Sequence, residues 1–129
     1  MKSLINNILG IFDVTLARKS AYKELLSKQN KLRDYELSEA IESKFLLEYF
    51  ENLKLSKSQL RQDLFVLSEL GFKREGFFVE FGATNGVDLS NSYLLETKFG
   101  WNGILAEPAK RWHGDLVQNR SVNIEKDCV

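Results

Sequence analysis

An acidic residue followed by a glycine-rich loop stands near the middle of the 129-residue chain. The run reads Glu80-Phe81-Gly82-Ala83-Thr84-Asn85-Gly86, directly after a short apolar stretch. Glycine at 82 and 86 allows the backbone to turn tightly and to approach a ligand without an intervening Cβ. The amides of such a loop can also bind the polar end of a ligand. The run therefore predicts a ligand-binding loop.

A second acidic residue follows a second apolar stretch, in the run Ile104-Leu105-Ala106-Glu107-Pro108. A carboxylate at the tip of a strand can accept hydrogen bonds from both hydroxyls of a ribose. Glu107 follows Glu80 by 27 residues, which is close to the spacing at which ribose-binding acids occur in nucleotide-binding folds. The two acids together predict a nucleoside site.

Two other nucleotide sites fit the loop less well. A dinucleotide fingerprint needs glycine where this chain has Thr84 and Val87, and no Gly-Lys-Ser/Thr follows the first apolar stretch, as a P-loop requires. A nicotinamide-dependent oxidoreductase is therefore a disfavoured alternative. The loop better suits a nucleoside with a compact zwitterionic tail, and S-adenosylmethionine is such a molecule.

The elements that must position these residues alternate along the second half of the chain. The aromatic and β-branched run 77–81 predicts a strand covered on both faces, and 103–106 predicts a second strand. A helix is expected over 90–99 with Ser90 as its cap, and another from Pro108 to about Asn119. Residues 122–129 complete a βαβαβ unit. This order predicts an α/β fold, the first half of a doubly wound parallel sheet.

The first part of the chain has a helical pattern. Residues 1–54 contain one glycine and no proline, and the polar segment 28–34 is expected to join two helices. Ser56 and Gln59 have the spacing of a capping box, which predicts a helix over 57–70 that ends at Gly71. We therefore expect a helical N-terminal arm over 1–54 and a partial nucleotide-binding domain over 55–129.

Composition excludes several classes of protein. Eighteen basic and eighteen acidic residues give zero formal net charge, so nucleic acid is not an expected partner. The lone Cys128 excludes a disulfide framework and a cysteine-based zinc site, which fits a reducing cytoplasm. No run is long enough to span a membrane. One apolar helix face is instead expected to pack against protein; it consists of Leu4, Ile5, Ile8, Leu9, Phe12 and Leu16.

Several residues with chemical potential have simpler structural interpretations. His113 is the one histidine and could act as a general base, but its place in a surface helix favours a solvated side chain. Trp101 is expected in the core, beside an apolar strand. Lys110, Arg111 and Arg120 are expected on a solvated helix face.

The stretch from about residue 56 to 129 resembles the FkbM family of methyltransferases. The resemblance rests on Ser58-Gln59, Gln62-Asp63-Leu64, the run 76–86, Asp88, Ser90-Asn91, Leu95-Glu96, 100–103 and Ala106-Glu107-Pro108. It implies a Rossmann-like class I methyltransferase that moves the methyl group of S-adenosylmethionine to an acceptor, often a hydroxyl of a sugar or secondary metabolite.

The resemblance also implies roles for individual residues. Glu107 would hold the ribose, and Gln59 and Asp63 would close the methionine side. Ser90 and Asn91 would lie on the first turn of the helix behind the loop. The methionine end would be surrounded by Glu80, Gly82, Ala83, Asn85 and Gly86. No catalytic residue is implied.

The sequence departs from the family in one respect. The family's later strands and its acceptor pocket have no counterpart, so an incomplete and inactive methyltransferase is expected. The strand over 77–81 would then have an unpaired edge, which favours self-association. A non-catalytic interaction protein with a vestigial nucleotide-binding half-fold is the alternative from another functional class.

Overall fold

The computed structural model describes residues 2–127, with side chains described for Leu16 and for residues 18–127. The chain divides into two compact units, Met1–Glu36 and Leu37–Val129. Each unit is considered by itself. The predicted boundary after residue 54 separates functional domains and stays a prediction.

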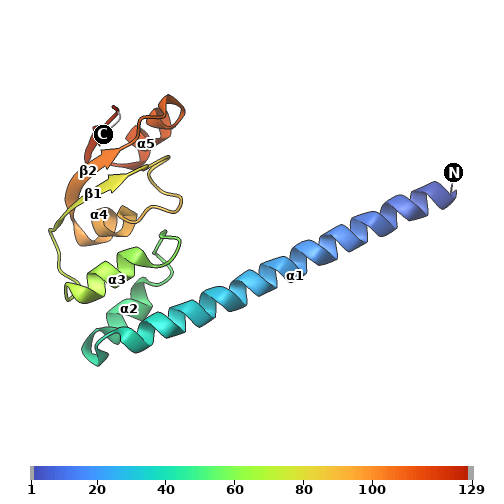
Figure 1. The fold of residues 1–129 in the computed structure, drawn as a ribbon, viewed down its shortest axis with the longest axis horizontal. Helices are drawn as coiled ribbons and strands as arrows, with labels where there is room; N and C mark the ends of the chain where they lie inside the picture. Colours follow the sequence, from blue (N-terminus) through green and yellow to red (C-terminus); the bar gives the residue numbers. More distant parts are fainter. Residues whose placement is uncertain (1, 128–129) are drawn as a thin grey trace. The chain divides into compact units, whose positions relative to one another are not determined.

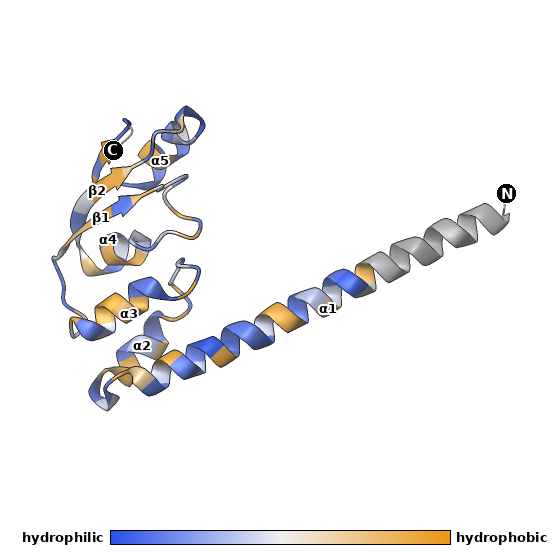
Figure 2. Ribbon diagram, viewed as in Figure 1, coloured by the Kyte–Doolittle hydropathy of each residue, from blue (hydrophilic) through white to orange (hydrophobic). Residues whose placement is uncertain are grey.

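The first unit is formed by one long helix, α1 (Lys2–Ala40). The predicted join at 28–34 is wrong, because the helix runs through it without a break. Four of the six polar residues there are good helix formers: Lys28, Gln29, Lys31 and Arg33. Lys28 also forms an ion pair of 2.9 Å with Glu24 one turn earlier. Hydrophilic residues predominate along the described part of this helix (Figure 2).

The predicted apolar face of this helix lies largely outside the described side chains. Leu16 is its one described member, and it is exposed. Within the described part of the chain, no helix combines the length and the apolar character that crossing a membrane requires.

Three short helices precede the sheet: η1 (Ser43–Phe45), α2 (Leu46–Asn52) and α3 (Gln62–Glu69). The predicted helix over 57–70 thus begins late, at Gln62. Its first amide is bound by the Ser58 hydroxyl, which accepts a hydrogen bond of 2.9 Å from the Gln62 N–H. Ser56 does not cap the helix but donates to Asp63 at 2.7 Å. Gly71 ends the helix at φ +61°, as predicted.

The second unit contains an open sheet of three parallel strands in the order β1 (Phe77–Phe81), β2 (Asn102–Ala106) and β3 (Asn123–Glu125). α4 (Tyr93–Phe99) joins the first two strands, and η2 (Lys110–Trp112) with α5 (His113–Asn119) joins the last two (Figure 1). The predicted α/β alternation is therefore confirmed. Residues 128–129 of the predicted third strand lie outside the described residues.

Both connecting helices begin later than predicted, although their ends agree. α4 begins at Tyr93, and the Ser90 hydroxyl accepts a hydrogen bond of 3.1 Å from the Tyr93 N–H. The N-cap residue is Ser92, so the prediction of Ser90 as the cap is wrong by two positions, although the Ser90 hydroxyl still satisfies the first amide of the helix. After Pro108 the helical turn begins at Lys110, and α5 ends at Asn119.

Helices cover one face of β1 and leave the other face exposed. Phe78 and Leu105 lie in the core with the apolar residues of α4 and α5, whereas Phe77, Val79 and Phe81 are 62%, 51% and 67% exposed. The prediction that this strand is covered on both faces is wrong. Right-handed crossovers that progress in one direction across a sheet place their helices on the same face.

Trp101 is buried beside β2, as predicted. Its indole N–H donates to the carbonyl of Lys73 at 2.8 Å, which satisfies its one polar group. Gly76 lies against the indole ring, because a Cβ there would come within 2.5 Å of a ring carbon. The start of β1 is thereby fixed against the start of β2.

Candidate cofactor site at the strand tips

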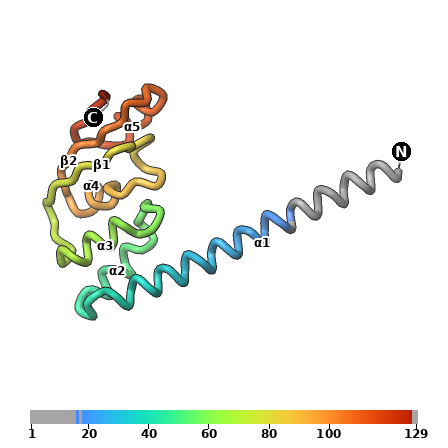
Figure 3. Tube along the Cα trace, in the orientation of Figure 1, coloured from blue at the N-terminus to red at the C-terminus, as the bar shows by residue number. Residues whose placement is uncertain are grey.

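The carboxyl ends of β1 and β2 lie side by side. The two strands are parallel, and Phe81 is paired with Ala106 in the register. The Cα trace shows the chain leaving β1 through the long loop 82–92 and returning through α4 to β2 (Figure 3). The loop after β1 is bound to the last residue of β2, because the Gly82 N–H donates to the Ala106 carbonyl at 2.8 Å. The two predicted ligand-binding segments are therefore adjacent.

Glu107 joins these segments through its carboxylate. One oxygen accepts a hydrogen bond of 2.8 Å from the Thr84 N–H, and the other accepts one of 2.8 Å from the Ala109 N–H. The residue is only 4% exposed. Because each carboxylate oxygen offers two acceptor positions, each retains one beyond these two hydrogen bonds.

The loop after β1 has two glycines with different surroundings. Gly82 has φ +71°, and a Cβ built on it would meet nothing within 4 Å. Gly86 has φ +80°, and its Cβ would lie 2.6 Å from Arg120 Cγ and 2.7 Å from a methyl group of Leu116. Gly82 thus faces open space that a ligand can occupy, whereas Gly86 permits a close approach by the protein itself.

Two other predicted loop residues have contacts within the protein. Ala83 is buried in the core. The Asn85 side-chain oxygen accepts hydrogen bonds from the Val87 and Asp88 N–H groups at 3.0 and 2.9 Å, and its amide donates to Asp88 at 2.8 Å. The Asn85 side chain therefore holds the shape of the loop.

Glu80, at the penultimate position of β1, is bound to the segment before α4. Its carboxylate accepts hydrogen bonds from the Ser90 hydroxyl at 2.9 Å, from the Asn91 N–H at 2.8 Å and from the Ser92 hydroxyl. The structure thus brings Glu80, Ser90 and Asn91 together. Ser90 and Asn91 lie before α4 rather than on its first turn, where the resemblance places them. The three residues form a cluster apart from the contacts of Glu107.

Arg120 is the residue that sequence reasoning missed. The prediction of a solvated helix face is wrong for Arg120, because its side chain is fully buried. Its guanidinium lies 2.5 Å from Glu96 and 3.9 Å from Glu80. It also donates to the Gly86 carbonyl at 2.9 Å and to the Ser92 hydroxyl at 2.9 Å. A single basic residue just after a helix gives no sequence signal for such a role.

His113 is half-buried, and a ring nitrogen lies 2.7 Å from the Glu107 carbonyl oxygen. The expectation of a freely solvated side chain is therefore wrong. The cause is the short 3-10 turn after Pro108, which brings the start of α5 back over the tip of β2. His113 thus packs on the backbone of a predicted site residue.

Ser58 connects α3 to the loop before α4. Its hydroxyl hydrogen-bonds to the side-chain oxygen of Asn91 at 2.8 Å. Asp63, by contrast, is 1% exposed, and one of its carboxylate oxygens has no hydrogen-bond partner within the described residues. The other oxygen of Asp63 accepts hydrogen bonds from the Ser56 hydroxyl at 2.7 Å and the Leu64 N–H at 2.8 Å, neither of which belongs to the loop after β1. Gln59, the other residue implied to close the methionine side, is exposed. Their role at the methionine end stays a prediction.

Burial raises the pKa of the Asp63 carboxyl, and the hydrogen bond from Ser56 opposes this rise less strongly. The folded state therefore holds the proton more tightly than the unfolded chain does. The resulting stabilisation is fully present below about pH 3.9, the ordinary pKa of aspartate, and is lost as pH rises through the raised folded pKa.

Replacing Asp63 with asparagine should remove this loss of stability at rising pH. The free energy of unfolding of Asp63→Asn, relative to the parent chain, should rise between about pH 4 and about pH 7. Urea unfolding at the two pH values measures the change. Asp115→Asn, at an exposed position of α5, separates the effect of burial from that of removing a carboxyl. If the difference in free energy of unfolding between Asp63→Asn and the parent chain does not vary with pH, the buried carboxyl is ionised across this pH range and its pKa is not raised.

Among the described residues, no group of three or more histidine, cysteine, aspartate or glutamate side chains could hold a metal ion. Comparisons with protein-family models, with curated proteins and with solved structures gave no match. The order and parallel pairing of its three strands identify the chain as an α/β protein with an open parallel sheet.

Proposed function

We propose that the tips of β1 and β2 bind S-adenosylmethionine and that the protein is a methyltransferase of the FkbM type. The acceptor would be a hydroxyl of a small molecule or glycan. The proposal assigns the ribose to Glu107 and the methionine end to the loop after Gly82. It assigns a catalytic role to no residue of this chain.

The observation that carries the proposal is the position of Glu107. Its buried carboxylate lies at the tip of the second parallel strand and is fixed by amides from both loops. In open α/β sheets, ligands bind outside the carboxyl ends of the strands, where an acid of this kind binds ribose hydroxyls. Two backbone hydrogen bonds hold the carboxylate in place before a ligand arrives.

The geometry of the first loop adds support. Open space beside Gly82 lets a ligand approach the backbone directly. The hydrogen bonds of Asn85 and the buried Arg120 fix the rest of the loop, so a ligand would meet a preorganised surface. Glu80 holds the end of this loop in place, because its carboxylate accepts hydrogen bonds from the Ser90 hydroxyl and the Asn91 N–H.

The proposal predicts a specific defect for Glu107→Gln. A glutamine retains the size of the side chain but accepts hydrogen bonds through only one oxygen. The variant should bind S-adenosylmethionine about tenfold more weakly, since a hydrogen bond to a charged group contributes about 1.5 to 3 kcal/mol. Isothermal titration calorimetry measures the affinity. NAD is the negative control and should not bind.

A second readout separates ribose binding from loop structure. The parent chain should bind adenosine about tenfold more tightly than 2′,3′-dideoxyadenosine, and Glu107→Gln should lose this preference. If the substitution only loosened the loops, binding of both ligands would weaken equally and the preference for adenosine would remain. That result would remove Glu107 from the ribose site.

A second candidate function is favoured by the exposed side of β1. Phe77, Val79 and Phe81 present large apolar side chains to solvent, and β1 has a strand partner on only one edge within residues 2–127. Such an edge can bind another strand. A non-catalytic interaction protein that binds its partner through this strand is therefore the competing proposal. Failure of S-adenosylmethionine to bind, together with association through β1, would favour it.

A further inference from the structure

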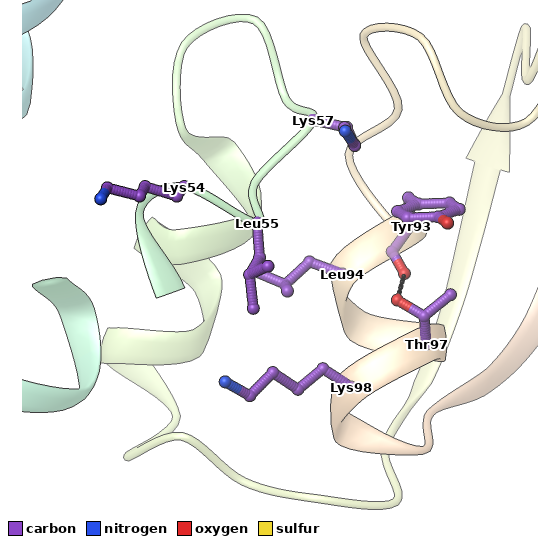
Figure 4. A pocket seen from close by; sticks show the side chains of 7 residues that line it. All are labelled: Lys54, Leu55, Lys57, Tyr93, Leu94, Thr97 and Lys98. Atoms are coloured by element: carbon purple, nitrogen blue, oxygen red, sulfur yellow. Dashed lines mark hydrogen bonds between the residues drawn. The ribbon is translucent and has the colours of Figure 1, made fainter. Parts of the chain in front are cut away.

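A pocket of about 320 Å³ opens between the segment after α2 and the outer surface of α4. Leu55 and Leu94 meet in the middle of the close-up view, with Lys54 and Lys98 extending to one side and Tyr93 on the other (Figure 4). Thr97 also lines the pocket, but its hydroxyl donates to the Tyr93 carbonyl at 2.7 Å. The centre of the pocket is therefore apolar, and it shares no residue with the proposed cofactor site.

The charged groups around this pocket are all positive. Lys54, Lys57 and Lys98 line it, and no acidic residue does. The basic side chains that form ion pairs in the described part of the chain, such as Lys28, Lys44 and Arg120, lie elsewhere. Three lysines gathered at one pocket, with no acidic residue among its lining within the described residues, create a local positive potential in a chain of zero net charge.

We propose that this pocket binds an anionic group, a phosphate or a carboxylate, attached to a short apolar body. The anion would lie near the ammonium groups of Lys54 and Lys98, which extend to the same side of the pocket (Figure 4). Lysine ammonium groups bind phosphate as mobile point charges. The apolar body would lie on Leu55 and Leu94. An apolar surface with a few polar groups at its rim is the usual composition of a small-molecule site.

The simplest competing explanation is a solvated helix surface. Lysine side chains often lay their methylene stems over apolar residues while the ammonium group stays in water. That arrangement would require no ligand and would show no preference between a charged and an uncharged amphiphile. The two explanations therefore differ in a measurable way.

The test is a titration of the full chain with octyl phosphate, followed by NMR of Leu94 and Tyr93. Octyl phosphate should bind at this pocket, and n-octanol and inorganic phosphate should each bind at least tenfold more weakly. Lys54→Glu/Lys98→Glu should lower the affinity for octyl phosphate about tenfold or more, since each exposed charge pair that is lost costs up to about fivefold and each reversal adds repulsion. Raising the salt concentration should weaken binding further.

The matched control is Lys73→Glu/Lys110→Glu, which makes the same change of charge at two exposed positions outside the pocket. It should leave the affinity within about twofold of the parent. Equal loss in both double variants, or equal binding of n-octanol and octyl phosphate, would overturn the proposal.

A parallel arm identifies the source of the anion. Vesicles of phosphatidylcholine with and without phosphatidylglycerol test whether the anion is a lipid headgroup. Binding to the anionic vesicles that is lost in Lys54→Glu/Lys98→Glu assigns the pocket to a lipid headgroup. Binding of octyl phosphate without vesicle binding assigns it to a free molecule, and binding of neither overturns the proposal.

Discussion

Replacing Arg120 with methionine should lower the free energy of unfolding of the 37–129 unit by about 3 to 5 kcal/mol. The guanidinium is fully buried, and the carboxylates of Glu80 and Glu96 are each 11% exposed beside it. Methionine fills a similar volume but leaves both carboxylates without their positive partner. Removing one member of a buried ion pair is costly because the remaining charge stays desolvated.

Urea unfolding followed by tryptophan fluorescence measures this effect. Arg111→Met is the matched control, because Arg111 is exposed and its guanidinium lies 4.9 Å from the Trp112 ring centroid. The control should cost less than about 1 kcal/mol. Adding Glu96→Gln to Arg120→Met should recover part of the loss, since the unpaired charge is then removed. An Arg120→Met variant as stable as Arg111→Met would contradict the buried network.

We expect the chain to self-associate through β1, and replacing Val79 with lysine should leave it a monomer. β1 has an open hydrogen-bonding edge within the described residues, and Phe77, Val79 and Phe81 share its exposed face. A groove of about 590 Å³ runs along this strand and is lined by Val66 and Leu70 of the α3 region. Open apolar edges pair with other strands, and a lysine on the edge prevents such pairing.

Sedimentation velocity at increasing concentration measures this association. The parent chain should show a rising average mass, whereas Val79→Lys should remain near 14.9 kDa, the mass of one chain. Val117→Lys, at a 54% exposed valine of α5, is the matched control and should associate like the parent. A parent chain that stays monomeric at every concentration would contradict an accessible β1 edge. Unchanged association of Val79→Lys would place the contact on another surface.

The alternation of strands and helices could be predicted from the sequence because each element carries its own local signal. The aromatic run of β1 and the glycine after α3 depend on neighbouring residues alone. Helix starts were predicted too early at α3 and α4. In both segments serine side chains bind backbone amides, and such bonds compete with the first helical turn.

The features that could not be predicted depend on contacts between distant parts of the chain. Arg120 is buried because Glu80, Glu96 and the Gly86 carbonyl surround it, and those residues come from three other segments. The exposed face of β1 likewise follows from where the crossover helices pack. A continuous apolar run in the sequence does not reveal whether one face or both faces of the strand are covered. The position of Glu107 was predicted, whereas its hydrogen bond from the Thr84 N–H required the register of β1 and β2.

The most direct test of the proposed cofactor site is amide NMR of the chain during titration with S-adenosylmethionine. We predict concentration-dependent shifts concentrated at residues 82–86 and at Glu107 and Ala109, with smaller shifts at Asn91 and none at Ser68 and Glu69, the end of α3. The amide of Thr84 should be among the most affected, because its N–H donates to the carboxylate that would bind the ribose. A spectrum that does not change with S-adenosylmethionine, or shifts confined to other surfaces, would contradict a cofactor site at the strand tips.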